Sequence, residues 1–259
     1  IDCDSAQIEA RVLAWLAGQD DLVSSFRDGE DVYVKMASRI YDKDESEVTK
    51  DERFVGKTTI LGSGYGMGAV KFQSQMATFG FEIDIAEARR VIQVYREANA
   101  EISGLWQEAQ LMIKELAKGQ EKSIGVPRVL EPVGNLSAVR LPSGLLMRYD
   151  DLEGVNDSRG VEYTYKRRNG RAKIYGGKFV ENACQALARC IIAEQMLKIA
   201  KHYRVALTVH DSIVCCVKED DAEQAKQDIE MYMRWVPDWA EGLPLDCEAF
   251  VGRSYGECE

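Results

Sequence analysis

Two aspartates stand in short motifs near opposite ends of the sequence. Asp4 lies in CDSAQIEAR (residues 3–11), and Asp211 lies in TVHDSIV (residues 208–214). Magnesium prefers oxygen ligands and keeps several waters, so one or two carboxylates and the phosphates of a substrate are enough to hold it. Two such ions about 3.5–4 Å apart promote in-line displacement at phosphorus. We therefore predict that Asp4 and Asp211 bind two Mg²⁺ ions, with the backbone carbonyl of Ser5 as a further ligand.

Each aspartate also has an ordinary structural explanation. Asp4 precedes an apolar-periodic stretch, where aspartate commonly caps a helix. Asp211 lies between two apolar runs, where aspartate is a common turn residue. Considered alone, either structural role is the more common one, and only the motif between the two aspartates favours the metal-binding interpretation.

That middle motif consists of four side chains spaced four residues apart, Arg53, Lys57, Leu61 and Tyr65. On a helix this spacing makes a slowly winding ridge roughly 18 Å long, which is comparable to a nucleoside triphosphate. Arginine binds phosphate as a planar fork and lysine as a point charge. Leucine suits contact with a sugar and tyrosine suits stacking near a base. The ridge therefore predicts a nucleotide-binding surface.

The alternative explanation of the ridge is an ordinary amphipathic helix, because residues four apart are neighbours on any helix. A series of glycines at positions 62, 64, 66 and 68 favours the functional interpretation. Each glycine inside a helix costs about 1 kcal/mol relative to alanine. Such a series indicates a helix end, a pivot, or close approach of another molecule.

The elements expected to position these residues follow from hydrophobic periodicity. A strand ending at Asp4 should lead directly into a helix from Ser5 to Ala17. Further helices are expected over residues 20–27, 31–41, 45–65, 69–79, 84–118, 178–203 and 221–235. Residues 126–148 and 163–175 are β-rich and interrupted by proline and glycine, which predicts twisted hairpins. Residues 205–209 and 213–217 form a hairpin that presents Asp211, and a last strand lies near 245–251. The fold class is α+β: a small antiparallel sheet carrying both aspartates, with a large helical insertion.

Composition limits the functional classes. The chain has 259 residues, 46% hydrophobic content and a net charge of −10, which argues against a non-specific nucleic-acid coat. Local cationic clusters occur at Lys166, Arg167, Arg168, Arg171 and Lys173, and again at Lys50, Arg53 and Lys57. The first cluster is explained equally well as a solvated hairpin.

The cysteines and the apolar segments bear on the compartment. Seven cysteines without a C-x-x-C pair suggest neither a zinc site nor a disulfide framework. No apolar run approaches the roughly 20 residues of a membrane span, and the acidic start is unlike a signal peptide. We therefore expect a soluble cytoplasmic protein, encoded by a bacterium or its phage, that has no membrane partner.

The three motifs together resemble those of the family A, polymerase I-like DNA polymerases. Residues 4–11 resemble motif A, residues 53–66 resemble motif B on the fingers helix, and residues 209–212 resemble motif C, in the correct order. The segment GGKFVENACQALAR (residues 176–189) is similar to the helix before motif C, particularly in phage members. The resemblance covers essentially the whole chain. It implies palm segments at residues 1–14 and 177–259, and fingers with a β-hairpin insertion at residues 15–176.

The resemblance also implies a role for each matching residue. Asp4 and Asp211 would bind the two magnesium ions, and Lys57 would in addition donate a proton to departing pyrophosphate. Nucleotide contacts would come from Arg53, Lys57, Leu61, Tyr65, Glu9, Gln7 and Tyr33, with Glu9 pairing with Tyr65 so that deoxyribonucleotides are preferred. Gln185 and His210 would contact primer or template. The partners would be primer-template DNA and a dNTP.

Four positions depart from the common family pattern. Leu61 replaces an aromatic residue, which removes a ribose contact and should alter sugar discrimination or rate. Ser212 replaces a glutamate, so that a third acidic group is absent after Asp211. Tyr33 replaces a frequent histidine and Ser5 a frequent tyrosine. We expect these departures to tune activity without abolishing it.

In the family, an exonuclease-like domain, a thumb and early palm strands precede motif A. These parts lie outside the sequence, and the thumb supplies much of the grip on duplex DNA. The leading hypothesis is template-directed addition of dNMP to a primer 3′-hydroxyl. A second is a nucleotide- or DNA-binding half that is active only with an N-terminal, thumb-containing segment. A third is a two-metal nuclease, in which the ridge would have no natural task.

Overall fold

The computed structural model describes residues 1–157 and 160–258. The chain divides into two compact units: unit 1 comprises Ile1–Val12 and Cys184–Glu259, and unit 2 comprises Leu13–Ala183. Two helices contribute to both units, α1 (Ile8–Ala17) and α8 (Gly176–Ile199). Mixed helix and antiparallel sheet confirm the predicted α+β class.

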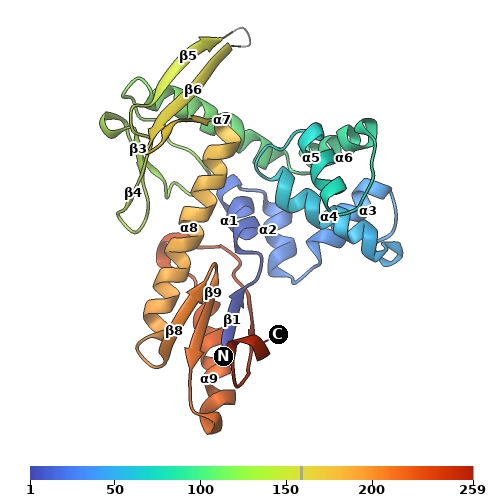
Figure 1. Ribbon diagram of the computed structural model, residues 1–259, viewed down its shortest axis with the longest axis vertical. Helices are drawn as coiled ribbons and strands as arrows, with labels where there is room; N and C mark the ends of the chain where they lie inside the picture. The colour runs from blue at the N-terminus through green and yellow to red at the C-terminus, as the bar shows by residue number, and fades with distance from the viewer. Residues whose placement is uncertain (158–159, 259) are drawn as a thin grey trace. The chain divides into compact units, whose positions relative to one another are not determined.

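Unit 1 is built on a four-stranded antiparallel sheet in the order β10-β1-β9-β8 (Figure 1). The strands are β1 (Asp2–Ser5), β8 (Arg204–Val209), β9 (Ser212–Cys216) and β10 (Cys247–Phe250). Successive side chains of a strand point to opposite faces, and β1 accordingly buries Cys3 and Ser5 while Asp4 is exposed. The predicted hairpin around Asp211 is confirmed, since β8 pairs with β9 across a two-residue turn.

One helix covers the buried face of this sheet. Helix α9 (Ala222–Met233) packs against β1 and β10 and buries Ala225, Ile229 and Met233. The part of α8 in unit 1 is tied to the end of α9 by Gln195, whose Nε2 donates to the carbonyls of Met233 at 2.6 Å and Trp235 at 3.0 Å. The sheet that carries the aspartates therefore rests on a packed layer. Short 3₁₀ turns at Glu219–Asp221, Asp238–Ala240 and Tyr255–Glu257 complete the unit.

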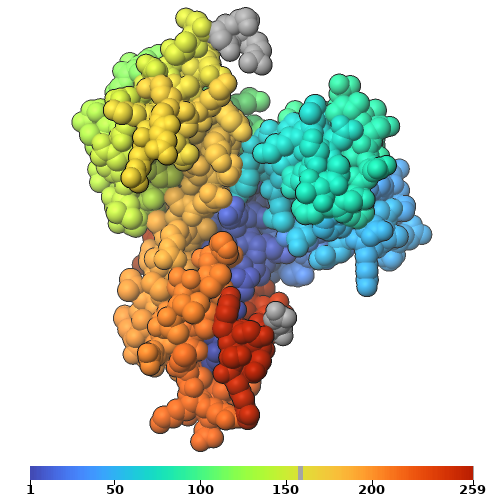
Figure 2. Space-filling view, viewed as in Figure 1, coloured from blue at the N-terminus to red at the C-terminus, as the bar shows by residue number. Residues whose placement is uncertain are grey.

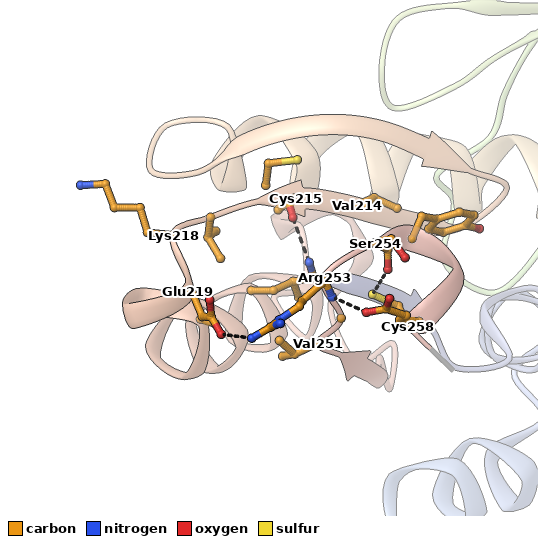
Figure 3. A pocket seen from close by; sticks show the side chains of 15 residues that line it. Val214, Cys215, Lys218, Glu219, Val251, Arg253, Ser254 and Cys258 are labelled. Atoms are coloured by element: carbon orange, nitrogen blue, oxygen red, sulfur yellow. Dashed lines mark hydrogen bonds and ion pairs between the residues drawn. The ribbon is translucent and has the colours of Figure 1, made fainter.

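A cavity of about 790 Å³ lies in unit 1 beside the first residue (Figure 3). The amino group of Ile1 donates to the carbonyl of Cys215 at 2.9 Å, and Arg253 pairs with Glu219 at 3.0 Å across the lining. Neither Asp4 nor Asp211 lines this cavity. This cavity is thus separate from the residues predicted to do chemistry.

Unit 2 is mainly helical. Its helices are α2 (Asp20–Arg27), α3 (Val32–Tyr41), α4 (Lys50–Ser63), α5 (Ala69–Thr78), α6 (Ile85–Ala98) and α7 (Ala100–Leu116). Helix α4 begins with a capping box, in which Thr49 and Glu52 each accept from the other's backbone amide. Helices α3 and α6 begin at side-chain caps from Asp31 and Asp84.

Two predicted helices of this unit are each divided. The expected helix over 45–65 is a short 3₁₀ turn, Glu45–Glu47, followed by α4, because the capping box at Thr49 starts a new helix. The expected helix over 84–118 breaks at Asn99, where φ is −126° and ψ is 59°. The backbone amide and the side-chain amide of Asn99 both donate to the carbonyl of Tyr95 at 2.9 Å, and α7 begins at the next residue.

A close helix contact underlies the nucleotide ridge. A Cβ added at Gly56 of α4 would lie 2.2 Å from the carbonyl oxygen of Tyr33 and 3.0 Å from the amide of Ala37, both on α3. No larger residue fits there without moving one of the backbones. Gly56 therefore allows α3 and α4 to approach closely, which brings the start of α3 beside the start of α4.

The β-rich part of unit 2 forms two three-stranded sheets, β2-β3-β4 and β5-β6-β7. Their strands are Glu131–Val133, Ala138–Arg140, Leu146–Arg148, Glu153–Asp157, Gly160–Arg167 and Gly170–Ile174, with a 3₁₀ turn at Gly134–Leu136. The second sheet meets the start of α8 through the aromatic rings of Tyr165, Tyr149 and Phe179. The predicted hairpins are present, and the strand Glu153–Asp157 is an addition that the sequence did not predict.

Two further findings concern the classes considered from the sequence. In the described part of the chain, none of the helices has both the length and the apolar character needed to cross a membrane. None of the seven cysteines, all in the described part of the chain, forms a disulfide, and six of them are buried.

Candidate active site

Acidic side chains gather on the exposed face of the unit 1 sheet. Strand register places Asp4 opposite Glu248 of β10 and opposite Ser212 of β9. Removal from water raises the pKa of Asp4 above its ordinary value, and repulsion by Asp211, Asp2 and Glu248 raises it further, with His210 opposing. Asp4 and Asp211 therefore lie close enough to interact electrostatically, although more than 200 residues separate them in the sequence.

Sequence reasoning missed two of these acids. Asp2 shares a face with Asp4 by strand alternation, which was a usable signal. Glu248 becomes a neighbour only through the register of β10, and nothing local in the sequence indicates that pairing. The hydroxyl of Ser212 donates a short hydrogen bond to the Asp2 carboxylate. The residue that follows Asp211 thus holds a second carboxylate in place instead of supplying one.

The donors at this face are too few to hold a metal ion by themselves. Among residues 1–157 and 160–258, no group of three or more His, Cys, Asp or Glu side chains is arranged to hold a metal ion. The repulsion that raises the pKa of Asp4 is nevertheless the electrostatic environment that a cation relieves. The side chain of Ser5 is buried and its hydroxyl has no partner, so only its backbone could serve as a ligand.

Two of the predicted substrate contacts have a left-handed backbone. Gln7 has φ 53° and His210 has φ 52°, and within unit 1 they are the two described non-glycine residues with positive φ. Such a conformation costs about 1–3 kcal/mol and is concentrated at functional sites. Gln7 turns the chain from β1 into α1, so the helix starts at Ile8 and not directly after Asp4 as predicted. His210 precedes Asp211 in the β8–β9 turn and presents an exposed imidazole.

The remaining predicted residues of unit 1 lie on helices. Glu9 is half-buried in the first turn of α1, and Gln185 is exposed on α8. Both positions leave the polar end of the side chain near the surface of the unit.

In unit 2, Arg53 is already paired. Its Nε lies 2.7 Å from Oδ2 of Asp31, and its guanidinium carbon lies 5.4 Å from the ring centroid of Tyr33. The other carboxylate oxygen of Asp31 caps α3 by accepting from the amides of Tyr33 at 3.0 Å and Val34 at 3.1 Å. The predicted residues Arg53 and Tyr33 thus come together through Asp31, which the sequence analysis did not identify.

The next two ridge residues are exposed on α4. Lys57 has no carboxylate within 4 Å among the described residues, which leaves its ammonium available to a ligand. Leu61 is 42% exposed although it is apolar. The buried residues of α4 are Val55, Gly56, Thr58, Thr59, Ile60 and Ser63, so Lys57 and Leu61 lie on the solvent side of the helix.

Tyr65 lies beyond the end of α4, which corrects the expectation of one continuous helix to residue 65. The helix ends at Ser63, and Gly66 has φ 79°, a conformation that glycine adopts without strain. The indole of Trp106 donates to the carbonyl of Gly64 at 2.8 Å, and a Cβ at Gly177 would lie 2.3 Å from the carbonyl oxygen of Tyr65. The glycines therefore serve a helix end and tight packing around the Tyr65 turn.

A cavity of about 390 Å³ adjoins this turn within unit 2. Gly66, Arg96, Trp106 and Tyr175 line it, and Tyr175 is 52% exposed. The guanidinium of Arg96 lies 6.0 Å from the ring centroid of Trp106. Aromatic faces beside a guanidinium suit a base and its phosphate.

Comparison with known proteins identifies the family of the chain. The model of DNA polymerase family A matches residues 1–257. The chain belongs to DNA polymerase family A. A DNA polymerase of Bacillus phage SP02 is 30% identical over 97% of this chain and 40% of its own length. A thermostable DNA polymerase I of Thermus filiformis is 26% identical over 99% of this chain and 27% of its own.

A solved structure shares the fold of this family A chain. The POL domain of Pol1 from M. smegmatis, determined with DNA primer-template and dNTP, matches 99% of this chain and 40% of its own chain. Its TM-score is 0.69 and its identity is 20%. The chain therefore has a polymerase I-like fold and spans less than half the length of these relatives.

Proposed function

We propose that this chain carries the catalytic and nucleotide-binding residues of a template-directed DNA polymerase, which adds dNMP from dNTP to a primer 3′-hydroxyl. One observation supports this most directly: Asp4 and Asp211, from the motifs that resemble A and C, lie close enough at one sheet face that burial and then repulsion by Asp211 raise the pKa of Asp4. Membership of family A supports a metal-binding role for that pair. In this proposal unit 1 is the palm and unit 2 is the fingers.

Asp4 and Asp211 hold Mg²⁺ together with the backbone carbonyl of Ser5. Two bound ions would activate the attacking hydroxyl and stabilise the charge of the leaving pyrophosphate. The carboxylates themselves fix the position at which phosphate oxygens are bound. Asp2 and Glu248 add negative charge at the same face and so strengthen the attraction for a divalent cation.

The nucleotide is bound by the residues of the ridge and by the motif A turn. Arg53 and Lys57 bind the triphosphate, and Lys57 donates a proton to pyrophosphate as it departs. Tyr33 and Gln7 assist at the phosphates. Leu61 contacts the sugar, while Tyr65 stacks near the base.

Selection of the sugar and alignment of the DNA involve three further side chains. Glu9 limits the space at the 2′ position of the sugar, which favours deoxyribonucleotides. Gln185 and His210 contact primer or template near the new base pair. The left-handed backbone of His210 supports this role, because such strain persists where function requires it. The cavity beside Gly66 suits a template base.

We propose that an N-terminal segment with a thumb acts together with this chain. The support is the share of the relatives that the chain spans, 40% in the case of the phage SP02 polymerase. Since the relatives are polymerases of phages and bacteria, the proposed site of action is the bacterial cytoplasm.

Primer extension tests the proposal. The chain alone, and the chain fused behind the N-terminal portion of the phage SP02 polymerase, are incubated with primer-template, dNTPs and Mg²⁺. We expect primer extension, and Asp211→Asn should abolish it. Asp220→Asn, which neutralises a residue of the 3₁₀ turn Glu219–Asp221, should leave extension unchanged. Retained extension by Asp211→Asn would contradict the assignment.

The second candidate is a partner-dependent binding half without activity of its own. The incomplete coverage of every relative described above favours it. In that case the chain alone binds dNTP in the presence of Mg²⁺ but extends no primer, while the fusion extends it. Activity of the unfused chain would exclude this second candidate.

A further inference from the structure

The hairpin formed by β6 and β7 carries an unusual density of positive charge. Cationic residues number 33 of 259 in the whole chain, so eight residues would carry about one. Residues 166–173 carry five: Lys166, Arg167, Arg168, Arg171 and Lys173. The same eight residues contain no acid, in a chain with net charge −10. The proposed polymerase chemistry assigns no role to this cluster.

The two faces of the β5-β6-β7 sheet differ in character. Tyr163 and its cross-strand partner Ile174 are buried, and Tyr165 packs edge-on against Tyr149 at 5.1 Å between ring centroids. The opposite face carries Lys166 directly across from Arg171, with Lys173 across from Thr164. One face therefore anchors the sheet to its unit, and the other presents cations to solvent.

This arrangement is not what stability alone would produce. Like charges directly opposite each other on neighbouring strands are destabilising. Lys166 lies 3.6 Å from Asp151, but both side chains are about two-thirds exposed, and Lys173 pairs with Glu162 at the surface. Exposed pairs of this kind contribute about 0–1 kcal/mol each. A phosphate could therefore replace either carboxylate at little cost.

The cations at the hairpin tip are less restrained. Arg168 has no carboxylate within 4 Å among the described residues, and Arg167 contacts only the ring of Tyr165, at 5.7 Å from the centroid. Arg171 differs, because its Nε donates to the Thr164 hydroxyl at 2.9 Å and its Nη2 donates to the Asp151 carbonyl at 2.6 Å. Arg171 is thus a structural residue. Lys166 has an exposed ion pair with Asp151 that a phosphate can replace, and the charges of Arg167 and Arg168 have no carboxylate partner among the described residues.

We propose that the cationic hairpin, residues 160–174, binds the phosphodiester backbone of nucleic acid as a contact additional to the polymerase site. Figure 2 shows the yellow surface to which this segment belongs on the visible side of the molecule. Between residues 166 and 173 the hairpin offers guanidinium and ammonium groups but no large apolar side chain. A protein interface requires an apolar core, whereas phosphate contacts require only charge and donors.

The chemistry of the hairpin determines the kind of binding. The aromatic rings of Tyr163 and Tyr165 are engaged in packing, so no base can stack on them. Binding should therefore be independent of base sequence and steeply dependent on salt. Each phosphate neutralised adds about 0.9 to the slope of log K against log salt for duplex DNA and about 0.7 for a single strand.

The test compares two triple variants with equal loss of charge. The hairpin variant combines Lys166→Gln, Arg167→Gln and Arg168→Gln. The control variant combines three substitutions at exposed residues of unit 2, Arg89→Gln, Lys114→Gln and Lys122→Gln. Binding of fluorescein-labelled single-stranded and duplex oligonucleotides is followed by anisotropy over a range of KCl concentrations. The hairpin variant should lower the magnitude of the slope by about 2 for the single strand or nearly 3 for the duplex.

The outcome decides the proposal in each case. A reduced slope in the hairpin variant with an unchanged slope in the control supports it, and the larger reduction identifies the preferred form of DNA. Equal slopes in both variants, or no binding by the unaltered chain at low salt, would overturn it. Circular dichroism of both variants checks that β5-β6-β7 remains folded.

This inference uses the proposed function only to choose nucleic acid as the polyanion. Asp211→Asn separates the two proposals, because it should abolish extension and leave the salt slope unchanged. The hairpin variant should reduce the salt slope and leave primer extension at low salt unchanged.

Discussion

The charged side chains proposed to bind the substrate are arranged in opposite ways in the two units. Unit 1 collects charges of one sign, so Asp4 is repelled by Asp2, Asp211 and Glu248 at a single sheet face. Unit 2 instead neutralises its phosphate-binding arginine in advance, since Arg53 lies 2.7 Å from Asp31. In unit 1, a bound cation would relieve the repulsion between the carboxylates. In unit 2, a bound phosphate would replace Asp31 as the partner of Arg53. Neutralising mutations should therefore have opposite effects on stability in the two units.

The largest effect is expected from removing a carboxylate of unit 1. Asp4→Asn should reduce primer extension on the order of 10³-fold, because several kcal/mol of transition-state stabilisation depend on the bound cations. In EDTA the same variant should melt at least as high as the unaltered chain, since Asn relieves the repulsion on Asp4. Primer-extension rates test the loss of activity, and melting temperatures in EDTA test the effect on stability. A lower melting temperature for Asp4→Asn than for the unaltered chain would show that repulsion at Asp4 does not destabilise unit 1.

A smaller effect is expected from the cations of unit 2. Lys57→Ala should weaken dNTP binding about 10- to 100-fold, because a charge-assisted hydrogen bond contributes about 1.5–3 kcal/mol. Arg53→Ala should cost less than Lys57→Ala, since part of the arginine's interaction is already made with Asp31. Fluorescence titration with dNTP and Mg²⁺ compares the two. Equal losses would show that the ion pair with Asp31 does not weaken the contribution of Arg53.

The ion pair itself can be removed without removing the helix cap. Asp31→Asn keeps a good capping residue at the start of α3 and should raise dNTP affinity by up to about fivefold, since exposed pairs contribute about 0–1 kcal/mol. Asp44→Asn is the matched control, because Asp44 caps the 3₁₀ turn Glu45–Glu47 and has no cation within 4 Å among the described residues. The same titration should show no change for the control.

The smallest effect concerns backbone strain. His210→Gly should raise the free energy of unfolding by about 1 kcal/mol, or 2–4 °C in melting temperature, while it lowers extension. Asp42→Gly, at the left-handed end of α3 with φ 52°, should stabilise unit 2 similarly without affecting extension. Thermal melts and extension assays on both variants test whether strain at His210 serves the reaction.

The fold could be predicted wherever the signals were local. The strand ending at Asp4, the apolar runs on either side of the His210–Asp211 turn, and the helical periodicity of α8 identified the elements that carry Asp4, Asp211 and Gln185. The break at Asn99 was missed because it consists of one residue with non-helical backbone angles, within an otherwise unbroken helical pattern. The division at Thr49 was missed for a similar reason, although a capping box has a recognisable sequence.

The site was less predictable where it depends on contacts between distant segments. Glu248 faces Asp4 only through the register of β10 with β1. Asp31 reaches Arg53 only because Gly56 lets α3 and α4 approach. Neither partner has a motif of its own, since both act through positions that the folded backbone creates. The motif residues themselves could be read from spacing and resemblance.

The tethered counter-ion of Arg53 has a consequence for selectivity among the small anions of the cell. A carboxylate held 2.7 Å away competes at a high effective concentration, so chloride or a single phosphate gains little by displacing it. A polyphosphate that also reaches Lys57 is multivalent and overcomes this competition. Asp31 would thereby make Arg53 select ligands with several negative charges over the common monovalent anions.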